Sequence, residues 1–278
     1  MLSGINVTST IMRIASFNQQ NKAFLADSLM KIASGKAVNK PEDSTGDFFK
    51  AQNINTESRG YRVVQQQVGE AIAMNEVAVE AGSQVFGLLN DMMQLVDLYW
   101  DESDPDAQQA YKSDFSSRAS QITSIIANTR YDDKQLISDT SGDPLTSIYI
   151  NPHNQAQTYD ISFDNGDVVD SASLETLDIG APDKATVKST VQAELDKAAS
   201  YLAKTSAYSR GLWAQHNMIE KKLATNAGHE QAITGVNEAN ELTQVIKRQV
   251  AHDASLAMLA QANLMHRNVL MLCGLNRA

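Results

Sequence analysis

The chain reads YRVVQQQVGEAIAMNEVAVEAGSQVFGLLNDMMQLV at residues 61–96. Apolar side chains recur there mostly every three or four residues, which is the period of one face of an α-helix. They are Val63, Val64, Val68, Ile72, Val79, Val85, Leu88, Leu89, Met92, Leu95 and Val96. The helical pattern covers residues 45–100, and such a helix is roughly 80 Å long. Because a compact globule rarely holds so long a helix, it predicts a bundle or a coiled coil.

Helix-breaking residues lie on both sides of this segment. Upstream, Gly35 ends a preceding helix, and Pro41 predicts an extended turn because it disfavours helical backbone in the residue before it. Downstream, Asp104 and Pro105 are a cap and a first residue that suit the start of another helix. We expect that helix to reach about Thr129.

The two ends of the chain carry weaker helical patterns, over residues 7–33 and about 233–272. Asn18-Gln19-Gln20-Asn21 interrupts the apolar positions of the first. A helix with so little apolar area is not stable alone. We therefore expect the two ends to bury their apolar faces against each other or against other copies of the chain.

The middle of the chain has a different character. Residues 147–150, SIYI, and 158–163, TYDISF, favour strands and are separated by a turn at residues 151–154, NPHN. They predict a small β-hairpin. A long helical pattern then returns over residues 183–227, with Gly228 as its expected end.

Composition limits the class of protein. The net charge is −10, and no basic cluster suited to nucleic acid is present. The single cysteine, Cys273, excludes an intrachain disulfide framework. No run approaches ~20 apolar residues, and the N-terminus lacks the basic leader and apolar run of a cleavable signal. By these rules alone we would expect a cytoplasmic protein.

Catalytic patterns are missing from the sequence. The five histidines include no pair at the helical i, i+4 spacing of a zinc site, and Ile233 stands where the His229-Glu230 pattern would need its second histidine. There is no nucleophile-elbow, P-loop or dinucleotide-binding pattern. We expect no catalytic, cofactor-binding or metal site, and no enzymatic role.

Segments near both ends resemble bacterial flagellin. Residues 33–46, ASGKAVNKPEDSTG, resemble its N-terminal signature, with Pro41 and Ser44 as departures. Residues 258–263, MLAQAN, followed by VLML at residues 269–272, closely resemble its C-terminal ending. Residues 210–217, RGLWAQHN, are similar to an internal family pattern with one or two positions altered. The resemblance covers the chain except its middle.

The resemblance implies a mainly α fold, in which long antiparallel helices form a coiled coil of the two termini plus a helical bundle with a small central β-hairpin region. We expect residues 1–44 and 231–278 to form the inner coiled coil. Residues 45–138 and 183–230 would form the bundle, and residues 139–182 the hairpin and surface loops. The short middle implies a flagellin without large outer domains.

The resemblance also implies a function. It describes a structural subunit that self-assembles into the bacterial flagellar filament for swimming motility, after type III export. The chain would then be secreted and extracellular, which replaces the cytoplasmic prediction. Expected partners are identical or paralogous subunits, an export chaperone, and cap and junction proteins, with no nucleic acid, no membrane insertion and no cofactor.

The resemblance places a polymerisation interface on the terminal helices. The residues expected there are Ile11, Ile14, Leu25, Leu29, Ile32, Leu256, Leu259, Gln261, Asn263, Val269, Leu270 and Leu272. The resemblance also implies a site for animal innate receptors. In the family, these receptors recognise a surface helix that carries spaced arginines before a Glu-Leu pair. Here Asp97-Leu98 match that pair, but Gln94 and Val96 occupy the arginine places, so we expect weak receptor activation.

Three alternatives stay open at this stage. A hook–filament junction protein of the same family shares the N-terminal signature, although the ending at residues 258–272 favours flagellin. An enzyme or adhesin displayed on a filament is a second hypothesis, against which the small middle region speaks. A cytoplasmic coiled-coil protein is the third.

Overall fold

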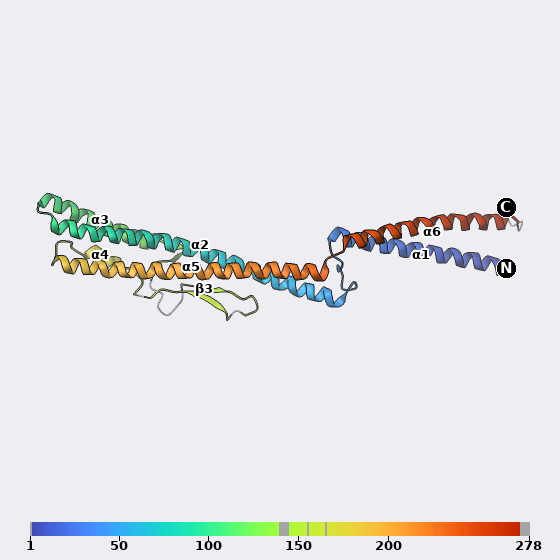
Figure 1. Ribbon diagram of the computed structural model, residues 1–278, viewed down its shortest axis with the longest axis horizontal. Helices are drawn as coiled ribbons and strands as arrows, with labels where there is room; N and C mark the ends of the chain where they lie inside the picture. Colours follow the sequence, from blue (N-terminus) through green and yellow to red (C-terminus); the bar gives the residue numbers. More distant parts are fainter. Residues whose placement is uncertain (1, 139–144, 155, 165, 273–278) are drawn as a thin grey trace. The chain divides into compact units, whose positions relative to one another are not determined.

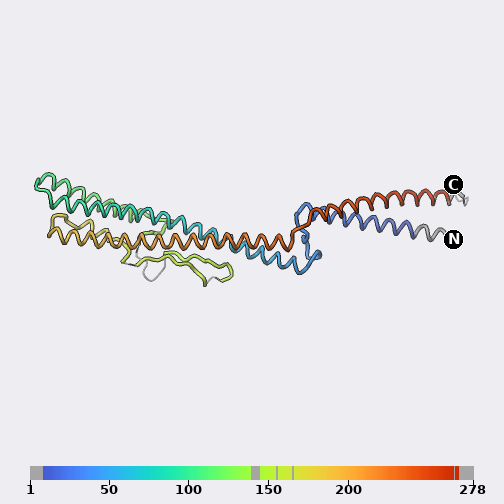
Figure 2. The backbone as a smooth tube through the Cα atoms, viewed as in Figure 1, coloured from blue at the N-terminus to red at the C-terminus, as the bar shows by residue number. Residues whose placement is uncertain are grey.

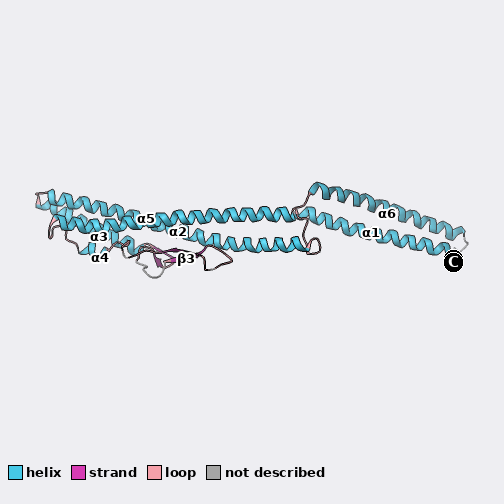
Figure 3. Ribbon diagram, turned by 60° about the horizontal axis from the view of Figure 1, so that its bottom comes forward, coloured by secondary structure: helices cyan, strands magenta, loops and turns pink. Residues whose placement is uncertain are grey.

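The computed structural model describes residues 2–138, 145–154, 156–164 and 166–272 (Figure 1). Their contacts divide the chain into two compact units. We call residues up to 56 together with those from 225 onward the terminal unit, and residues 57–224 the bundle unit. Helices dominate both, and strands occur in small patches beside the bundle helices (Figure 3). The predicted mainly α fold is confirmed.

The bundle unit is held together by side chains from three long helices, α2 (Thr45–Asp101), α3 (Pro105–Asn128) and α5 (Lys184–Thr234). Their apolar stripes meet in one core, as the sequence period predicts. Its fully buried members include Val68, Leu89, Met92, Val96, Ile122, Val187, Val191, Leu212 and Ile219. Val63, by contrast, is 59% exposed and lies outside this core.

The start of α3 follows the local chemistry that its sequence predicts. The Asp104 side chain accepts a hydrogen bond from the backbone N–H of Asp106, which satisfies one of the free donors of the first turn. Pro105 occupies the first helical position, where a missing N–H costs nothing. The backbone N–H of Thr129 bonds to Ile125 at the other end.

A short hairpin that we did not predict follows α3. Its strands are β1 (Arg130–Tyr131) and β2 (Lys134–Gln135), joined by Asp132 and Asp133. Both aspartates have positive φ, 48° and 62°, as a two-residue hairpin turn requires. Asp-Asp is a weak turn signal because glycine is the usual residue in such positions.

The predicted central hairpin is present. Strand β3 (Thr146–Tyr149) pairs antiparallel with β4 (Thr158–Ile161), with Ile148 opposite Tyr159. Beyond β4, Phe163 is buried against Tyr201, with ring centroids 4.6 Å apart, and against Tyr208. This aromatic cluster joins the hairpin to α5.

Glycines on the bundle helices let the hairpin approach closely. The Tyr159 phenol lies directly over Gly211 of α5, and the Pro152 ring packs over Gly60 of α2. A β-carbon at either glycine would overlap these side chains. The two glycines therefore position the hairpin on the bundle.

Two buried carboxylates fix the loop after the hairpin to α5. Asp167 accepts hydrogen bonds from the Ser200 hydroxyl, at 2.6 Å, and from the ammonium group of Lys204. Glu194 accepts one from the backbone N–H of Asp170 at 2.7 Å. Asp170 in turn caps the short helix α4 (Ser171–Thr176), which the sequence analysis did not predict.

The end of α5 differs from the prediction. Gly228 does not end the helix, which continues to Thr234, and α6 (Glu238–Leu272) starts after a short turn. Glu230 lies in this extra turn and accepts hydrogen bonds from Lys36, at 2.7 Å, and from Asn55. These contacts supply stabilisation that outweighs the low helix propensity of one glycine.

In the terminal unit, α1 (Leu2–Ser34) and α6 run antiparallel side by side, so that α1 begins at the end of the pair where α6 finishes (Figure 2). Gly35 ends α1 with φ 68°, the left-handed conformation common after a helix. Backbone hydrogen bonds then join the two linkers, from Ala37 to Thr234 and from Val236 to Gly35. The two ends pair with each other, as one of the two predicted arrangements has it; many of their large apolar side chains nevertheless stay exposed.

We predict that Gly211→Ala lowers the free energy of unfolding by about 1–3 kcal/mol, because the new methyl group displaces the Tyr159 phenol. Urea unfolding measures the change. Gly87→Ala is the matched control, since no atom lies near its added methyl group. It should raise stability by about 0.5–1 kcal/mol. Equal effects of the two substitutions would contradict the close approach of the hairpin.

We predict that Asp167 contributes stability that is lost in acid. Burial raises the pKa of this carboxyl, but hydrogen bonds from Lys204, Ser200 and the backbone of Asp164 outweigh burial and hold the pKa below its usual value. The contribution is therefore complete above the pKa of the unfolded chain and disappears as the pH falls through the lower pKa of the folded chain.

Asp167→Asn should therefore flatten the fall in unfolding free energy below about pH 4 and cost on the order of 1–3 kcal/mol at neutral pH. Urea unfolding at a series of pH values tests this. Asp196→Asn, at an exposed position of α5, is the control. An Asp167→Asn variant with the pH profile of the unmodified chain would refute the prediction.

Candidate assembly surface

Large apolar side chains are exposed along both helices of the α1–α6 pair. Their exposed fractions range from 42% at Met30 to 67% at Met265. We call this set the outer apolar face: Met12, Phe17, Phe24, Leu29, Met30, Leu242, Ile246, Val250, Leu256, Met258, Leu264 and Met265. Exposed apolar residues in such numbers mark a surface that another molecule covers.

The most deeply buried side chains of the pair are polar, although half-buried apolar residues lie on the same helices. Within the described parts of α1 and α6, the buried side chains are Asn18, Asn21 and Ser255, with exposed fractions of 9%, 1% and 0%. His252 lies one helical turn before Ser255, and its Nδ1 atom is also buried. We call these four residues the polar layer.

Contacts on either side place the polar layer in the seam between the helices. Towards the linkers, the guanidinium carbon of Arg248 lies 4.6 Å from the ring centre of Phe24. Towards the chain ends, Met258 lines one groove together with Ile14 and Phe17. The polar layer occupies the stretch of each helix between these two points.

Several atoms of the polar layer lack hydrogen bonds. Among the described residues, no partner reaches the Asn18 Oδ1 atom, either amide atom of Asn21, or the His252 Nδ1 atom. Ser255 donates to the carbonyl of His252 in its own helix. Each buried polar group without a partner costs about 1–3 kcal/mol. Four such atoms oppose the pairing of the two helices.

The interface residues expected from the sequence fall into three groups. Leu29 and Leu256 belong to the outer apolar face, and Gln261 and Asn263 are also exposed. The half-buried ones are Ile11, Ile14, Leu25, Ile32 and Leu259. Those whose side chains lie outside the described residues are Val269, Leu270 and Leu272. Their role at an interface stays a prediction.

Sequence reasoning missed much of the outer apolar face. Phe17, Phe24, Ile246 and Val250 are exposed there. The sequence analysis did not single out Phe17 or Phe24, and it took Ile246 and Val250 only as part of the weak helical pattern of residues 233–272. The spacing of Leu242, Ile246 and Val250, four residues apart, was the available signal.

The residues compared with a receptor-binding helix lie on α2 in the bundle unit. Gln94 and Leu98 are exposed, whereas Val96 is fully buried in the core. Asp97 accepts hydrogen bonds from Lys188 at 2.8 Å and lies 3.2 Å from the ammonium group of Lys184. These contacts hold the pKa of Asp97 below its usual value. Weak receptor activation stays a prediction.

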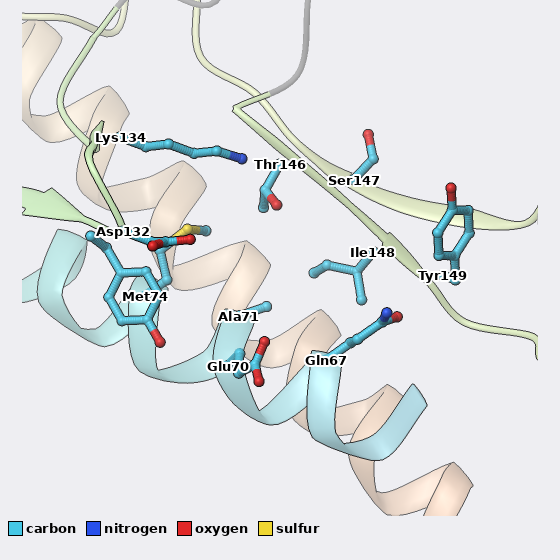
Figure 4. Close-up of a pocket in the computed structure, with 11 residues that line it drawn as sticks. Gln67, Glu70, Ala71, Met74, Asp132, Lys134, Thr146, Ser147, Ile148 and Tyr149 are labelled. Atoms are coloured by element: carbon cyan, nitrogen blue, oxygen red, sulfur yellow. The ribbon is translucent and has the colours of Figure 1, made fainter. Parts of the chain in front are cut away.

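A separate open groove lies on the bundle unit between α2 and the two hairpins (Figure 4). Glu70 of α2, Asp132 of the β1–β2 turn and Tyr149 of β3 are among its lining residues. The nearby Lys134 ammonium group donates to the carbonyl of Leu145 at 3.2 Å. The lining is mixed and open to solvent, so it offers no enclosed site for chemistry.

The described residues hold no cluster that suits a metal ion and no helix that suits a bilayer. Within residues 2–138, 145–154, 156–164 and 166–272, no three His, Cys, Asp or Glu side chains are grouped as a metal would need. In the same part of the chain, no helix combines the length and apolar character needed to span a bilayer.

Comparison with known proteins points to one family. A sequence profile described as the bacterial flagellin N-terminal helical region matches residues 5–141. A flagellin of Halalkalibacterium halodurans is 24% identical over 265 residues, which covers 92% of this chain and 93% of that protein. Flagellins of Listeria monocytogenes and Bacillus subtilis are 23% and 21% identical, and the alignments cover 93% and 96% of this chain and 95% and 97% of theirs.

Proposed function

Since the chain belongs to the flagellin family of flagellar structural proteins, we propose that it is the self-assembling subunit of the flagellar filament. The filament would be a homopolymer of identical or paralogous subunits that serves swimming motility. The role is structural rather than enzymatic, in keeping with the names of its relatives.

The outer apolar face is the observation that carries this proposal. A single chain leaves the large apolar side chains of α1 and α6 in water, and copies of the chain offer the same apolar surface in return. Covering it removes apolar area from water, which stabilises association by about 25 cal/mol for each Å². A repeated contact that does not close on itself produces a helical polymer.

The extent of the alignments with known flagellins supports a filament subunit without a large inserted domain. The alignments cover more than nine-tenths of both this chain and its relatives. The region between α3 and α5 holds two small hairpins and a short helix, with no large inserted domain in its described part. We infer a short flagellin whose polymer surface is formed largely by the bundle unit.

Several further elements of the proposal follow from family membership. The chain would leave the cell through the type III export channel and act as an extracellular protein. An export chaperone and the cap and junction proteins would be its other partners. Deletion of residues 1–35 should block export, so that the protein accumulates inside the cell. Normal export of the truncated chain would contradict this element.

Assembly of the purified protein tests the proposed function. We expect long tubes in electron micrographs after short filament fragments are added as seeds. A hook–filament junction protein should form no long tubes of its own, so a seeded sample without tubes would overturn the filament assignment.

Substitutions on the outer apolar face sharpen this test. Ile246→Glu combined with Val250→Glu should abolish tube growth, because both exposed side chains would bring a charge into the covered surface. Asn240→Glu combined with Thr243→Glu adds the same charge to exposed polar positions of α6 and should allow growth. Equal growth of both variants would place the interface elsewhere. Urea unfolding of the bundle unit should be the same in both.

A further inference from the structure

The methionines of the outer apolar face carry an inference about the chemical control of assembly, and it rests on the proposed function. We propose that four of them are sites of reversible oxidation by peroxides: Met12, Met30, Met258 and Met265. Their conversion to methionine sulfoxide stops a free subunit from joining the polymer, and reduction of the sulfoxides restores assembly. The bundle unit stays folded in both states.

Exposure separates these four methionines from the methionines of the core. Their side chains are 66%, 42%, 49% and 67% exposed, in the order given above. Met74 and Met92 in the core of the bundle unit are 5% and 0% exposed. Because a thioether must be accessible to react with an oxidant in water, a peroxide should oxidise the outer apolar face and spare the core.

The spacing of the four methionines places them in one stripe on each helix. Met258 and Met265 are seven residues apart on α6, which is close to two helical turns. Met12 and Met30 are 18 residues apart on α1, which is five turns. Met258 also lines a groove together with Phe17 of α1. Oxidation therefore adds polar groups at two levels of each helix, on the surface that other copies are proposed to cover.

The reaction converts a side chain that suits an interface into one that does not. The methionine thioether is apolar, flexible and well suited to irregular surfaces. Its sulfur lone pair attacks one peroxide oxygen, so that a sulfur–oxygen bond forms and the O–O bond breaks. The second oxygen takes the remaining proton and leaves as water. Sulfur is oxidised and the peroxide is reduced. The sulfoxide oxygen is a hydrogen-bond acceptor that loses its bond to water when another copy covers it.

The reverse reaction makes the modification a switch. Methionine sulfoxide reductases remove the sulfoxide oxygen as water and regenerate the thioether, while two thiols are oxidised to a disulfide. The side chain thus returns to its apolar form without new synthesis of the chain.

The test oxidises free subunits with hydrogen peroxide, removes the peroxide with catalase, and then adds dithiothreitol, which reduces oxidised Cys273 but leaves the sulfoxides in place. Peptide mass mapping should find sulfoxide at the four sites and at Met218, which is 53% exposed, but not at Met74 or Met92. Seeded tube growth should slow by about tenfold or more. Urea unfolding of the bundle unit should stay the same.

Leucine substitutions show which thioethers matter. A variant with leucine at all four sites keeps the size and apolar character of the side chains but has no sulfur there to oxidise. It should grow tubes as fast after peroxide treatment as before. Met218→Leu removes a comparably exposed thioether from α5 of the bundle unit and is the matched control, which should remain as sensitive as the unmodified chain. A four-site variant that loses growth as strongly as the unmodified chain would overturn the inference.

Enzymatic repair of the unmodified chain is a second test that needs no substitution. Oxidised subunits treated with both methionine sulfoxide reductases, one for each sulfoxide epimer, should regain seeded growth. Thioethers restored without growth would contradict the inference, as would normal growth of subunits that are fully oxidised at the four sites. Tube growth by untreated subunits tests the proposed function separately, so either of these results would leave that function intact.

Discussion

The α1–α6 pair buries two asparagines and leaves many large apolar side chains exposed, and the proposed assembly depends on this arrangement. Water is the best environment for the amides of Asn18 and Asn21, and the worst for side chains such as Phe24 and Ile246. A single chain cannot both hydrate these amides and remove the apolar side chains from water. Further copies can cover the apolar set, and the free energy gained in this way offsets the unsatisfied amides. Folding of the terminal unit is then linked to association.

The bundle unit is different because it buries its apolar side chains and pairs its buried carboxylates within one chain. Its core buries apolar side chains from all three long helices. The aromatic cluster around Phe163 joins the β3–β4 hairpin to α5, and the carboxylates of Asp167 and Glu194 fix the loop that follows it. The chain therefore combines a unit with its own apolar core and a unit whose large apolar side chains are mostly exposed. This division suits the filament subunit proposed above.

Much of the fold could be predicted because its signals are local. The apolar period of residues 61–96, the capping pair Asp104-Pro105 and the turn at Gly35 gave the helices with their ends. The β1–β2 hairpin was missed because two aspartates form a turn that glycine usually provides. Gly228 was wrongly taken as a helix end, since contacts of Glu230 distant in sequence stabilise the next turn. The exposed apolar residues of α1 and α6 were harder to predict, because a weak apolar stripe does not say which side of a helix faces its partner.

Hydrogen exchange of the free subunit and of the assembled polymer, followed by mass spectrometry, tests the central claim most directly. The account predicts that backbone amides of α1 and α6 exchange rapidly in the free subunit and become strongly protected on assembly. Amides in the core of the bundle unit should be protected in both states. Strong protection of α1 and α6 in the free subunit, unchanged by assembly, would contradict it.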